Sequence, residues 1–380
     1  MVLYLKAFTL EGFRNHKQTE VQPGQRINIF LGDNAQGKTN ILEAIYILAT
    51  AKSHRTNNDS EMIAFNQERF LVRGEVIRQN IPKILKVSVD RNRGKKVAVN
   101  GNERSHVSSL IGEMSAVIFS PEDIEMIRGS PLLRRRFIDI AISQTSPSYL
   151  HNLQRYNYII KQKNRILKQI VRDRKLNDLL EVYNAQLADV GSKILSKRLS
   201  ILKRLEDTSS HIHKSLTDEE ETIRIEYVST VLEHRGQIPN SDPEAYTIDR
   251  LGEKLKEVRG EEIRRGLSLA GPHRDDIAFH VNGINLRAYG SQGQQRTAAI
   301  SLKMGEVELI KEDIGEYPII LLDDLFSELD SLRSRAILKT LSKEAQVFLT
   351  SVNLNGLAVS EGDASLFLVS SGEVETYERK

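Results

Sequence analysis

The sequence predicts an α/β protein in which a mostly helical segment interrupts an α/β lobe, and three observations lead to this prediction. A strand-like run at residues 26–31 leads through a glycine-rich loop into helical spacing at residues 40–49. A fully apolar run at residues 318–322 ends in two carboxylates, as a buried parallel strand would. Residues 149–205 contain no proline and a single glycine, and their apolar residues recur at three and four. We therefore expect a mixed sheet with an inserted, mostly helical arm.

The composition is that of an ordinary globular protein. The chain has 380 residues, of which 39% are hydrophobic and 28% charged, and its net charge of +3 is too small by itself to indicate a polyanionic partner. It has no cysteine, which excludes disulfides and cysteine nucleophiles and fits a reducing compartment. The first residues lack a signal-peptide layout, and no run of about 18 apolar residues occurs. These features predict a cytoplasmic protein.

The N-terminal part is predicted to contain strands around one helix. Residues 4–10 and 25–31 are the first expected strands, with a turn between them. A short apolar strand at residues 116–119 ends at Ser120-Pro121, which is typical of a helix start. Three runs alternate apolar with polar residues, are separated by turn signals and predict an antiparallel β meander: residues 70–77, 84–89 and 97–100.

The middle of the chain is predicted to be a basic helical arm. Two long helices pack together with a turn near residues 173–178, and residues 151–204 carry 13 Lys or Arg against 4 Asp or Glu. A third helix is expected at residues 251–266, followed by β structure at 277–286 with a turn at Asn282-Gly283. These elements place the α/β lobe at residues 1–130 and 266–380 and the helical arm lobe at residues 131–265.

The glycine-rich loop matches the phosphate-binding pattern G-x-x-x-x-G-K-[ST] at every fixed position. In such a loop the backbone N–H groups and the N-terminus of the next helix surround a polyphosphate. Lys38 would reach the β- and γ-phosphates, and the Thr39 hydroxyl would bind Mg²⁺. The alternative is a glycine turn before a helix. The predicted ATP-binding loop consists of Gly32, Asp33, Asn34, Ala35, Gln36, Gly37, Lys38 and Thr39.

The two carboxylates after the apolar strand complete the predicted chemistry. Ligands bind at the C-terminal ends of strands in open α/β sheets. Asp323 would therefore hold Mg²⁺, and Asp324 would orient the attacking water, while Lys38 binds the phosphates. The alternative is that both carboxylates are solvated and merely follow a strand.

A second anion-binding device is predicted at Ser291-Gln292-Gly293-Gln294, at the start of a helix. The glycine loop already binds the nucleotide of its own chain. The simplest ligand for the second device is therefore the γ-phosphate held by another copy, which predicts a head-to-tail homodimer with two shared sites. The alternative is an ordinary helix cap.

Four segments, in order and spacing, resemble those of ABC-type ATPases. Residues 32–39 resemble the phosphate loop, residues 291–295 the signature, residues 321–324 the magnesium strand, and Ser327-Glu328-Leu329-Asp330 the D-loop. The resemblance narrows to the RecF family of bacterial recombination mediators. Its segments resemble residues 13–15, 53–56, 120–123, 129–137 and 271–276 of this chain.

The resemblance implies an ATPase head related to SMC proteins, with a short helical arm. It also implies ATP and Mg²⁺ as cofactors, ATP-dependent dimerisation on DNA at single-strand gaps or junctions, and slow hydrolysis that releases the dimer. Implied partners are RecR and RecO, with which the family loads recombinase in DNA repair, replication and the SOS response. Lys38, Thr39, Asp323, Asp324 and Ser291 match the family's functional positions, while Ser327 and Asp330 match its D-loop. A nucleoid-associated, cytoplasmic location follows.

Two departures from the wider ABC pattern favour slow turnover. Asp324 stands where a glutamate is more usual, which shortens the reach to water. Thr350-Ser351 stands where many ABC ATPases carry a γ-phosphate-sensing histidine. The glutamine loop has no clear counterpart, and Glu122 or a neighbour is a candidate.

Two further sets of residues are candidates on weaker patterns. Arg14, Asn15 and Arg55 lie in loops beside the nucleotide segment, and the family resemblance implies that they contact ATP. The alternative is that they do not touch the nucleotide. The DNA-binding candidates on the arm are Lys161, Lys163, Arg165 and Lys168, the alternative being a solvated arm that contacts only protein.

Three other functions share some of these motifs. An ABC transporter motor subunit would not need a basic hairpin, and a small-molecule kinase would not need a signature segment. A structural SMC-like ATPase would need much longer heptads. His273 with Asp275 and Asp276 suggests a metal site, but a structural role is favoured because no second histidine lies at ligand spacing.

Overall fold

The computed structural model describes residues 3–171, 173, 175–217, 219–232, 243–324, 341, 344–354 and 364–377. The chain divides into two compact units, one of Met1–Asp123 with Glu306–Lys380 and one of Ile124–Gly305. The predicted D-loop residues Ser327 and Asp330 lie outside the described residues. Each unit is considered by itself.

The first unit contains an antiparallel sheet with the strand order β2-β1-β4-β5-β6-β7. Along β4, alternate side chains such as Phe70, Val72 and Val76 are buried, because successive residues of a strand face opposite sides. The predicted meander is thus confirmed. Strand β2 was not predicted, because its residues are mostly polar and show no strand-like alternation. The bounds are β1 (Tyr4–Phe13), β2 (His16–Val21), β4 (Arg69–Arg78), β5 (Ile81–Asp90), β6 (Gly94–Val99) and β7 (Asn102–Glu103).

The second sheet of this unit has the order β15-β14-β3-β13-β12-β8 and is parallel except for β15. Every residue of β3, β12 and β8 is buried, as continuous apolar strands require. The predicted magnesium strand is therefore a central strand, between β13 and β8. The bounds are β3 (Ile27–Leu31), β8 (Ala116–Phe119), β12 (Ile319–Leu322), β13 (Val347–Ser351), β14 (Ala364–Ser370) and β15 (Glu373–Thr376).

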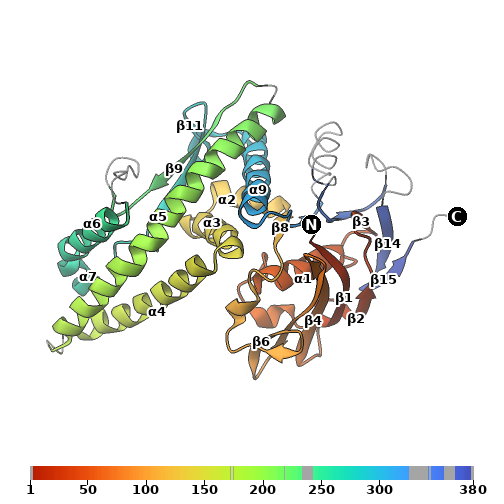
Figure 1. Cartoon of the computed structure of the whole chain (residues 1–380), viewed down its shortest axis with the longest axis horizontal. Coiled ribbons are helices and arrows are strands. Elements are labelled where there is room, and N and C mark those ends of the chain that lie inside the picture. Colours follow the sequence, from red (N-terminus) through yellow and green to blue (C-terminus); the bar gives the residue numbers. More distant parts are fainter. Residues whose placement is uncertain are drawn as a thin grey trace. The chain divides into compact units, whose positions relative to one another are not determined.

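Helix α1 (Lys38–Thr50) packs against strands of both sheets (Figure 1). Its apolar residues occur all round the helix, so that both sides can be covered. The main core of the unit combines side chains of α1, such as Ile45, with Phe70 of the first sheet and Leu321 of the second. This core fixes the N-terminus of α1 at the C-terminal ends of β3 and β12. The short 3₁₀ turns are Asp59–Met62, Val107–Leu110 and Pro121–Ile124.

The second unit is built on the predicted helical hairpin, which the structure confirms. Helix α4 (Pro147–Gln169) packs along α5 (Leu176–Leu216), as Figure 1 shows. Ile166, Leu167 and Leu180 belong to an apolar cluster near the turn of the hairpin. The hairpin therefore carries its own small core at its far end.

The remaining elements of this unit surround the hairpin. The helix expected at residues 251–266 is divided into two helices at Val258. No sequence signal marks this division. The turn at Asn282-Gly283 is confirmed, with φ values of 49° and 80°. The bounds are α2 (Glu125–Arg128), α3 (Pro131–Thr145), β9 (Ile223–Val228), α6 (Pro243–Glu257), α7 (Arg259–Arg265), β10 (Asp276–Val281), β11 (Ile284–Asn285), α8 (Leu286–Tyr289) and α9 (Gln292–Ile314).

The compact unit that contains the arm extends to Gly305, whereas the predicted arm lobe ends at residue 265. Strand β10 pairs with β9 from Asp276 opposite Val228 to Val281 opposite Ile223. These long-range backbone hydrogen bonds join residues 266–305 to the helical unit. No local pattern indicates that pairing.

An ion pair and several hydrogen bonds hold the segment at residues 271–276, and Arg134 of the basic cluster forms the ion pair. The Arg134 guanidinium donates to both carboxylate oxygens of Asp276, at 2.7 and 2.9 Å. Asp275 accepts hydrogen bonds from Thr230 and Tyr227. His273 and Tyr156 form a hydrogen bond of 2.8 Å. The structural role favoured for these residues thus fits their contacts, since polar groups at this depth require partners.

Among the described residues, no helix combines the length and the apolar character that crossing a membrane requires.

Candidate nucleotide-binding site

The glycine loop joins β3 to α1 and adopts a conformation that its glycines permit. Gly37, immediately before the helix, has a φ of 115°, which disfavours other residues. A Cβ atom on Gly37 would lie 2.7 Å from the Asn15 side chain, and one on Gly32 would lie 2.2 Å from the Val369 carbonyl oxygen. The loop is therefore held close to neighbouring backbone, and the helix starts at Lys38.

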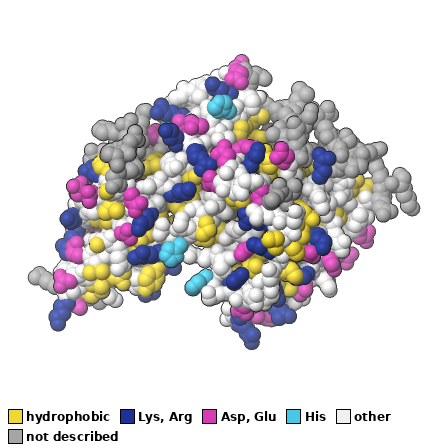
Figure 2. All heavy atoms as spheres, viewed as in Figure 1, with side chains coloured by type: hydrophobic (Ala, Val, Ile, Leu, Met, Phe, Trp, Pro, Cys, Tyr) yellow, Lys and Arg dark blue, Asp and Glu magenta, His cyan; other side chains and the backbone are white. Residues whose placement is uncertain are grey.

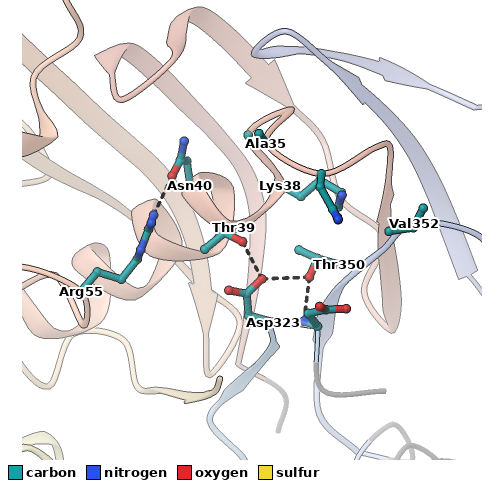
Figure 3. Close-up of a pocket in the computed structure, with 11 residues that line it drawn as sticks. Ala35, Lys38, Thr39, Asn40, Arg55, Asp323, Thr350 and Val352 are labelled. Carbon is teal, nitrogen blue, oxygen red and sulfur yellow. Dashed lines mark hydrogen bonds between the residues drawn. The ribbon is translucent and has the colours of Figure 1, made fainter. Parts of the chain in front are cut away.

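A pocket of about 410 Å³ opens beside this loop. It brings together the loop, the end of β12 and the end of β13 (Figure 3). Four of the predicted chemical residues meet here, namely Lys38, Thr39, Asp323 and Asp324. The lining residues are Asn34, Ala35, Gly37, Lys38, Thr39, Asn40, Arg55, Asp323, Asp324, Thr350 and Val352.

The Lys38 ammonium is bound to its own loop. Its Nζ donates to the carbonyl oxygens of Gly32 and Asp33, at 2.6 and 2.7 Å. Burial lowers the pKa of Lys38, and the nearby Asp324, Asp323 and Asp33 carboxylates oppose that shift. Among the described residues Lys38 forms no ion pair. A polyphosphate beside the loop would supply the anionic partner that this ammonium lacks.

Asp323 is buried and accepts two hydroxyl hydrogen bonds. Thr39 Oγ1 and Thr350 Oγ1 each donate to Asp323 Oδ1 at 2.9 Å (Figure 3). Burial raises the pKa of Asp323, while the two hydroxyl groups lower it. A carboxylate and a threonine hydroxyl are hard oxygen donors, which Mg²⁺ prefers. A cation at this point would also offset the cost of burying the carboxylate, so the residues fit Mg²⁺.

The described residues contain no group of three or more His, Cys, Asp and Glu side chains that could hold a metal by themselves. This agrees with the way Mg²⁺ is usually bound, through one or two protein carboxylates, water and substrate phosphates.

Asp324 is exposed and has a left-handed backbone, with a φ of 48°. Such a conformation costs roughly 1 kcal/mol or more outside glycine and persists only where neighbours hold it. The Asp324 N–H donates to Thr350 Oγ1 at 3.0 Å. Thr350 therefore holds both carboxylate residues, a role that the sequence pattern did not indicate.

Arg55 is the member of the Arg14, Asn15 and Arg55 set that lines the pocket. Its Nη1 donates to Asn40 Oδ1 at 3.0 Å (Figure 3). The same atom lies 3.6 Å from Glu43 Oε2. The side chain is 39% exposed. Its position fits the expected contact with a nucleotide phosphate.

Arg14 and Asn15 do not line the pocket, and their expected nucleotide contact stays a prediction. Arg14 donates to both oxygens of Glu43, at 2.8 and 2.7 Å. Asn15 Nδ2 donates to the Gln36 carbonyl oxygen at 2.9 Å, and its Oδ1 accepts from Asn40. Both side chains brace the site from outside, because their partners belong to the loop and to α1.

The hairpin of β14 and β15 also supports the loop, which the sequence did not reveal. Its turn residues Ser371 and Gly372 donate backbone N–H groups to the side-chain and backbone oxygens of Gln36, at 2.6 and 3.0 Å. His16 lies within hydrogen-bonding distance of the carbonyl oxygens of Gly37 and Gly372. In the sequence, Ser371-Gly372 is the one signal that could have indicated this hairpin, because it is typical of a turn.

The predicted signature lies in the second unit, where α9 begins. Gln294 N–H donates to Ser291 Oγ, and Ser291 N–H donates to Gln294 Oε1, each at 3.1 Å. This reciprocal pair is a capping box. Ser291, Gln292 and Gly293 are exposed, so a helix N-terminus is open to solvent here.

One predicted DNA-binding residue is wrong. Lys163 is completely buried and forms an ion pair with Glu262 at 2.8 Å. It cannot reach a phosphate, because the helical period turns it toward α7. The other three candidates, Lys161, Arg165 and Lys168, are exposed on α4.

Helix α4 also carries an exposed cation that the prediction omitted. Helix α4 contains no Asp or Glu, and Arg155 is exposed on it together with Lys161, Arg165 and Lys168. In the space-filling view, Lys and Arg side chains occur along the arm (Figure 2). These four cations form the α4 basic stripe.

The family profile described as RecF/RecN/SMC N terminal domain matches residues 4–374. A relative from Bacillus pumilus (strain SAFR-032), named DNA replication and repair protein RecF, is 40% identical over 375 residues, which cover 98% of this chain and 100% of the relative.

Solved structures show the same fold. One is described as the recombination mediator protein RecF-ATP in the RecFOR pathway. It is 34% identical, has a TM-score of 0.92 and covers 99% of this chain and 98% of its own. An Smc head domain from Pyrococcus furiosus, bound to the C-terminal domain of ScpA, is 15% identical with a TM-score of 0.56 and covers 99% and 96%. At that identity it supports the fold alone.

Proposed function

The chain belongs to the RecF family, and on this premise we propose that it is a Mg²⁺-dependent ATPase of DNA replication and recombinational repair. The observation that carries the proposal is the meeting of Lys38, Thr39 and Asp323 in one pocket at the N-terminus of α1. Phosphoryl transfer from ATP requires a cation that binds phosphate and oxygen ligands that bind Mg²⁺. Lys38 supplies the cation, and the Thr39 hydroxyl and the buried Asp323 carboxylate supply the oxygen ligands. The RecF-ATP neighbour supports ATP as the nucleotide.

In this proposal the side chains of the pocket exchange contacts within the protein for contacts with ATP and Mg²⁺. The Lys38 ammonium leaves the carbonyl oxygens of Gly32 and Asp33 for the phosphates. Thr39 and Asp323 hold Mg²⁺, which neutralises charge on the phosphate oxygens when it is bound. Asp324 accepts a hydrogen bond from the attacking water. Turnover is slow because the Asp324 carboxylate is short and Thr350 stands in place of a sensing histidine.

Two copies bind each other through ATP in this proposal. The exposed start of α9 offers backbone N–H groups and the Ser291 hydroxyl to an anion. The anion is the γ-phosphate of ATP held by the other copy, so that each nucleotide contacts both chains. Hydrolysis removes that phosphate and releases the dimer.

DNA is the proposed polyanionic partner. The α4 basic stripe carries four cations on a helix without acids, which supports binding of the phosphate backbone without sequence reading. Family membership supports gaps or junctions as the DNA structure, RecR and RecO as protein partners in recombinase loading, and a cytoplasmic, nucleoid-associated location.

Equilibrium titration of the whole chain with ATP and Mg²⁺ tests the core of the proposal. Lys38→Met should lose at least about tenfold in affinity, because a charged hydrogen bond to phosphate is worth about 1.4 kcal/mol or more. Lys161→Met, which removes an exposed lysine of α4, is the matched control and should bind ATP normally. Equal affinity of Lys38→Met and wild type would overturn the site. Sedimentation with ATP and gapped DNA then tests DNA binding.

A further inference from the structure

Glu43 is a fully buried carboxylate in the middle of α1, next to the nucleotide pocket but outside its lining. Its Oε1 accepts hydrogen bonds from Arg14 Nη2 at 2.7 Å and from Ser53 Oγ at 2.5 Å. Its Oε2 accepts one from Arg14 Nε at 2.8 Å. Burial by itself would raise the pKa of Glu43, but the hydrogen bonds from Arg14 and Ser53 hold it below its ordinary value. Glu43 is therefore an anion inside the protein.

Two arginines lie beside this one carboxylate, and they are held very differently. Arg14 forms a bidentate pair, and its third donor bonds to the Glu61 carbonyl oxygen at 2.9 Å. Arg55 Nη1 lies 3.6 Å from Oε2, within the range of an ion pair but beyond a hydrogen bond, and its hydrogen bond goes to Asn40. Arg14 thus neutralises Glu43, while Arg55 stays at the mouth of the pocket.

The loop that carries Arg55 is tied to the same carboxylate. Ser53 Oγ donates to Glu43 and accepts the backbone N–H groups of Arg55 and Thr56, at 2.9 and 3.1 Å. Glu43 therefore sets the position of the Arg55 backbone as well. The carboxylate would also capture the Arg55 side chain if nothing else balanced its charge, because a buried anion without a partner is costly.

We propose that Arg14 and Glu43 are positioning residues for Arg55: Arg14 occupies the Glu43 carboxylate and so leaves the Arg55 guanidinium available to a phosphate of the bound nucleotide. Arg14 then acts on ATP binding without touching ATP. This inference rests on the proposed ATP site. Double substitutions distinguish this indirect role of Arg14 from a direct contact between Arg14 and ATP.

The test is ATP affinity of whole-chain variants, measured by isothermal titration with Mg²⁺ present. Arg55→Gln should lose about tenfold, the value of one charged hydrogen bond. Arg14→Gln should lose a similar factor, because Glu43 then captures Arg55. Arg14→Gln in the Arg55→Gln background should cause no further loss. A multiplied loss in that double variant would mean that Arg14 contacts the nucleotide itself and would overturn the proposal.

The second double variant, Arg14→Gln with Glu43→Gln, removes both charges of the Arg14–Glu43 pair and so keeps the test available if Arg14→Gln alone does not fold. Its ATP affinity should return to within about threefold of wild type, since a neutral amide no longer attracts Arg55. A persistent tenfold loss, with thermal unfolding like that of wild type, would overturn the proposal. If wild type binds no ATP, the proposed function fails; if wild type and Arg55→Gln bind equally, only this inference fails.

Discussion

At the scale of single residues, Thr350 links the two carboxylates of the site. One hydroxyl donates to the buried Asp323 and accepts from the Asp324 backbone, whose φ of 48° needs support. Its position at the end of β13 explains why a threonine is useful where other ABC ATPases have a sensing histidine. It orders the carboxylate of Asp323, the proposed Mg²⁺ ligand.

Thr350→Val should therefore impair hydrolysis and stability together. Valine keeps the shape but leaves Asp323 with one fewer donor, which costs about 1–3 kcal/mol of unfolding free energy. Urea unfolding and steady-state phosphate release measure the two effects, and Thr350→Ser, which keeps the hydroxyl, should stay near wild type. Unchanged turnover in Thr350→Val would mean that this hydroxyl does not position Asp323.

Asp324→Asn separates ATP binding from hydrolysis. An amide is a poor acceptor for the proton of water, so the variant should bind ATP normally while turnover falls by about 10²-fold or more. Single-turnover hydrolysis measures the step directly. Glu20→Gln, which removes an exposed carboxylate that does not line the pocket, is the matched control and should turn over like wild type. Wild-type turnover in Asp324→Asn would remove Asp324 from that role.

His273 predicts how the stability of the protein depends on pH. Burial lowers its pKa from 6.5 to about 3, so the folded protein keeps it neutral. Below pH 6.5 the unfolded chain gains a proton that the folded chain rejects, and stability falls as the pH falls toward 3. The loss approaches about 1.4 kcal/mol per pH unit.

Between pH 7 and pH 5, wild type should therefore lose about 1–2 kcal/mol more unfolding free energy than His273→Gln. Urea unfolding at a series of pH values measures the slope. His151→Gln removes an exposed histidine of α4 and should leave the slope as in wild type. Identical slopes for wild type and His273→Gln would show that the buried histidine does not take part.

At the scale of elements, α4 shows how one helix divides its cations between two roles. Lys163 and Glu262 are both fully buried and paired, so this lysine joins α4 to α7. The α4 basic stripe points to solvent on other faces of the same helix. Because the helical period is 3.6 residues, Lys161 and Lys163 lie far apart around the axis.

Replacing the four stripe residues Arg155, Lys161, Arg165 and Lys168 with glutamine should weaken DNA binding and flatten its salt dependence. If each contacts one phosphate, the slope of log affinity against log salt falls by about 3–4. Fluorescence anisotropy with a gapped duplex at increasing salt measures it. Lys163→Met is the matched control: it should cost about 3–5 kcal/mol of stability and leave the slope of the folded protein unchanged. An unaltered slope in the stripe variant would place the DNA surface elsewhere.

At the scale of the whole molecule, the proposed function requires two chains for each nucleotide. Ser291→Arg places a large cation at the exposed start of α9 and should block the γ-phosphate of the other copy. The variant should bind ATP yet stay monomeric in sedimentation velocity, whereas wild type dimerises with ATP. Ser148→Arg alters another exposed serine at a helix start and should dimerise normally. ATP-dependent dimers of Ser291→Arg would refute the shared site.

Much of the fold was predictable because its signals are local. The loop from Gly32 to Thr39, the apolar strand before Asp323 and the periodic helices of the arm each lie within one stretch of chain. The hairpin of β14 and β15 and the pairing of β9 with β10 were not predictable. Strands β9 and β10 lie far apart in the sequence, and the β14–β15 hairpin, although local, offers only its Ser371-Gly372 turn as a signal.

The sequence by itself determined which chemical groups the site contains, since the loop, its lysine and threonine and the two aspartates are contiguous motifs. Only the tertiary structure decided which cations are available to ligands. Arg14 meets Glu43, 29 residues away, and Lys163 meets Glu262, 99 residues away. The physical reason is that a buried charge must be balanced by an opposite charge nearby, and folding chooses that partner.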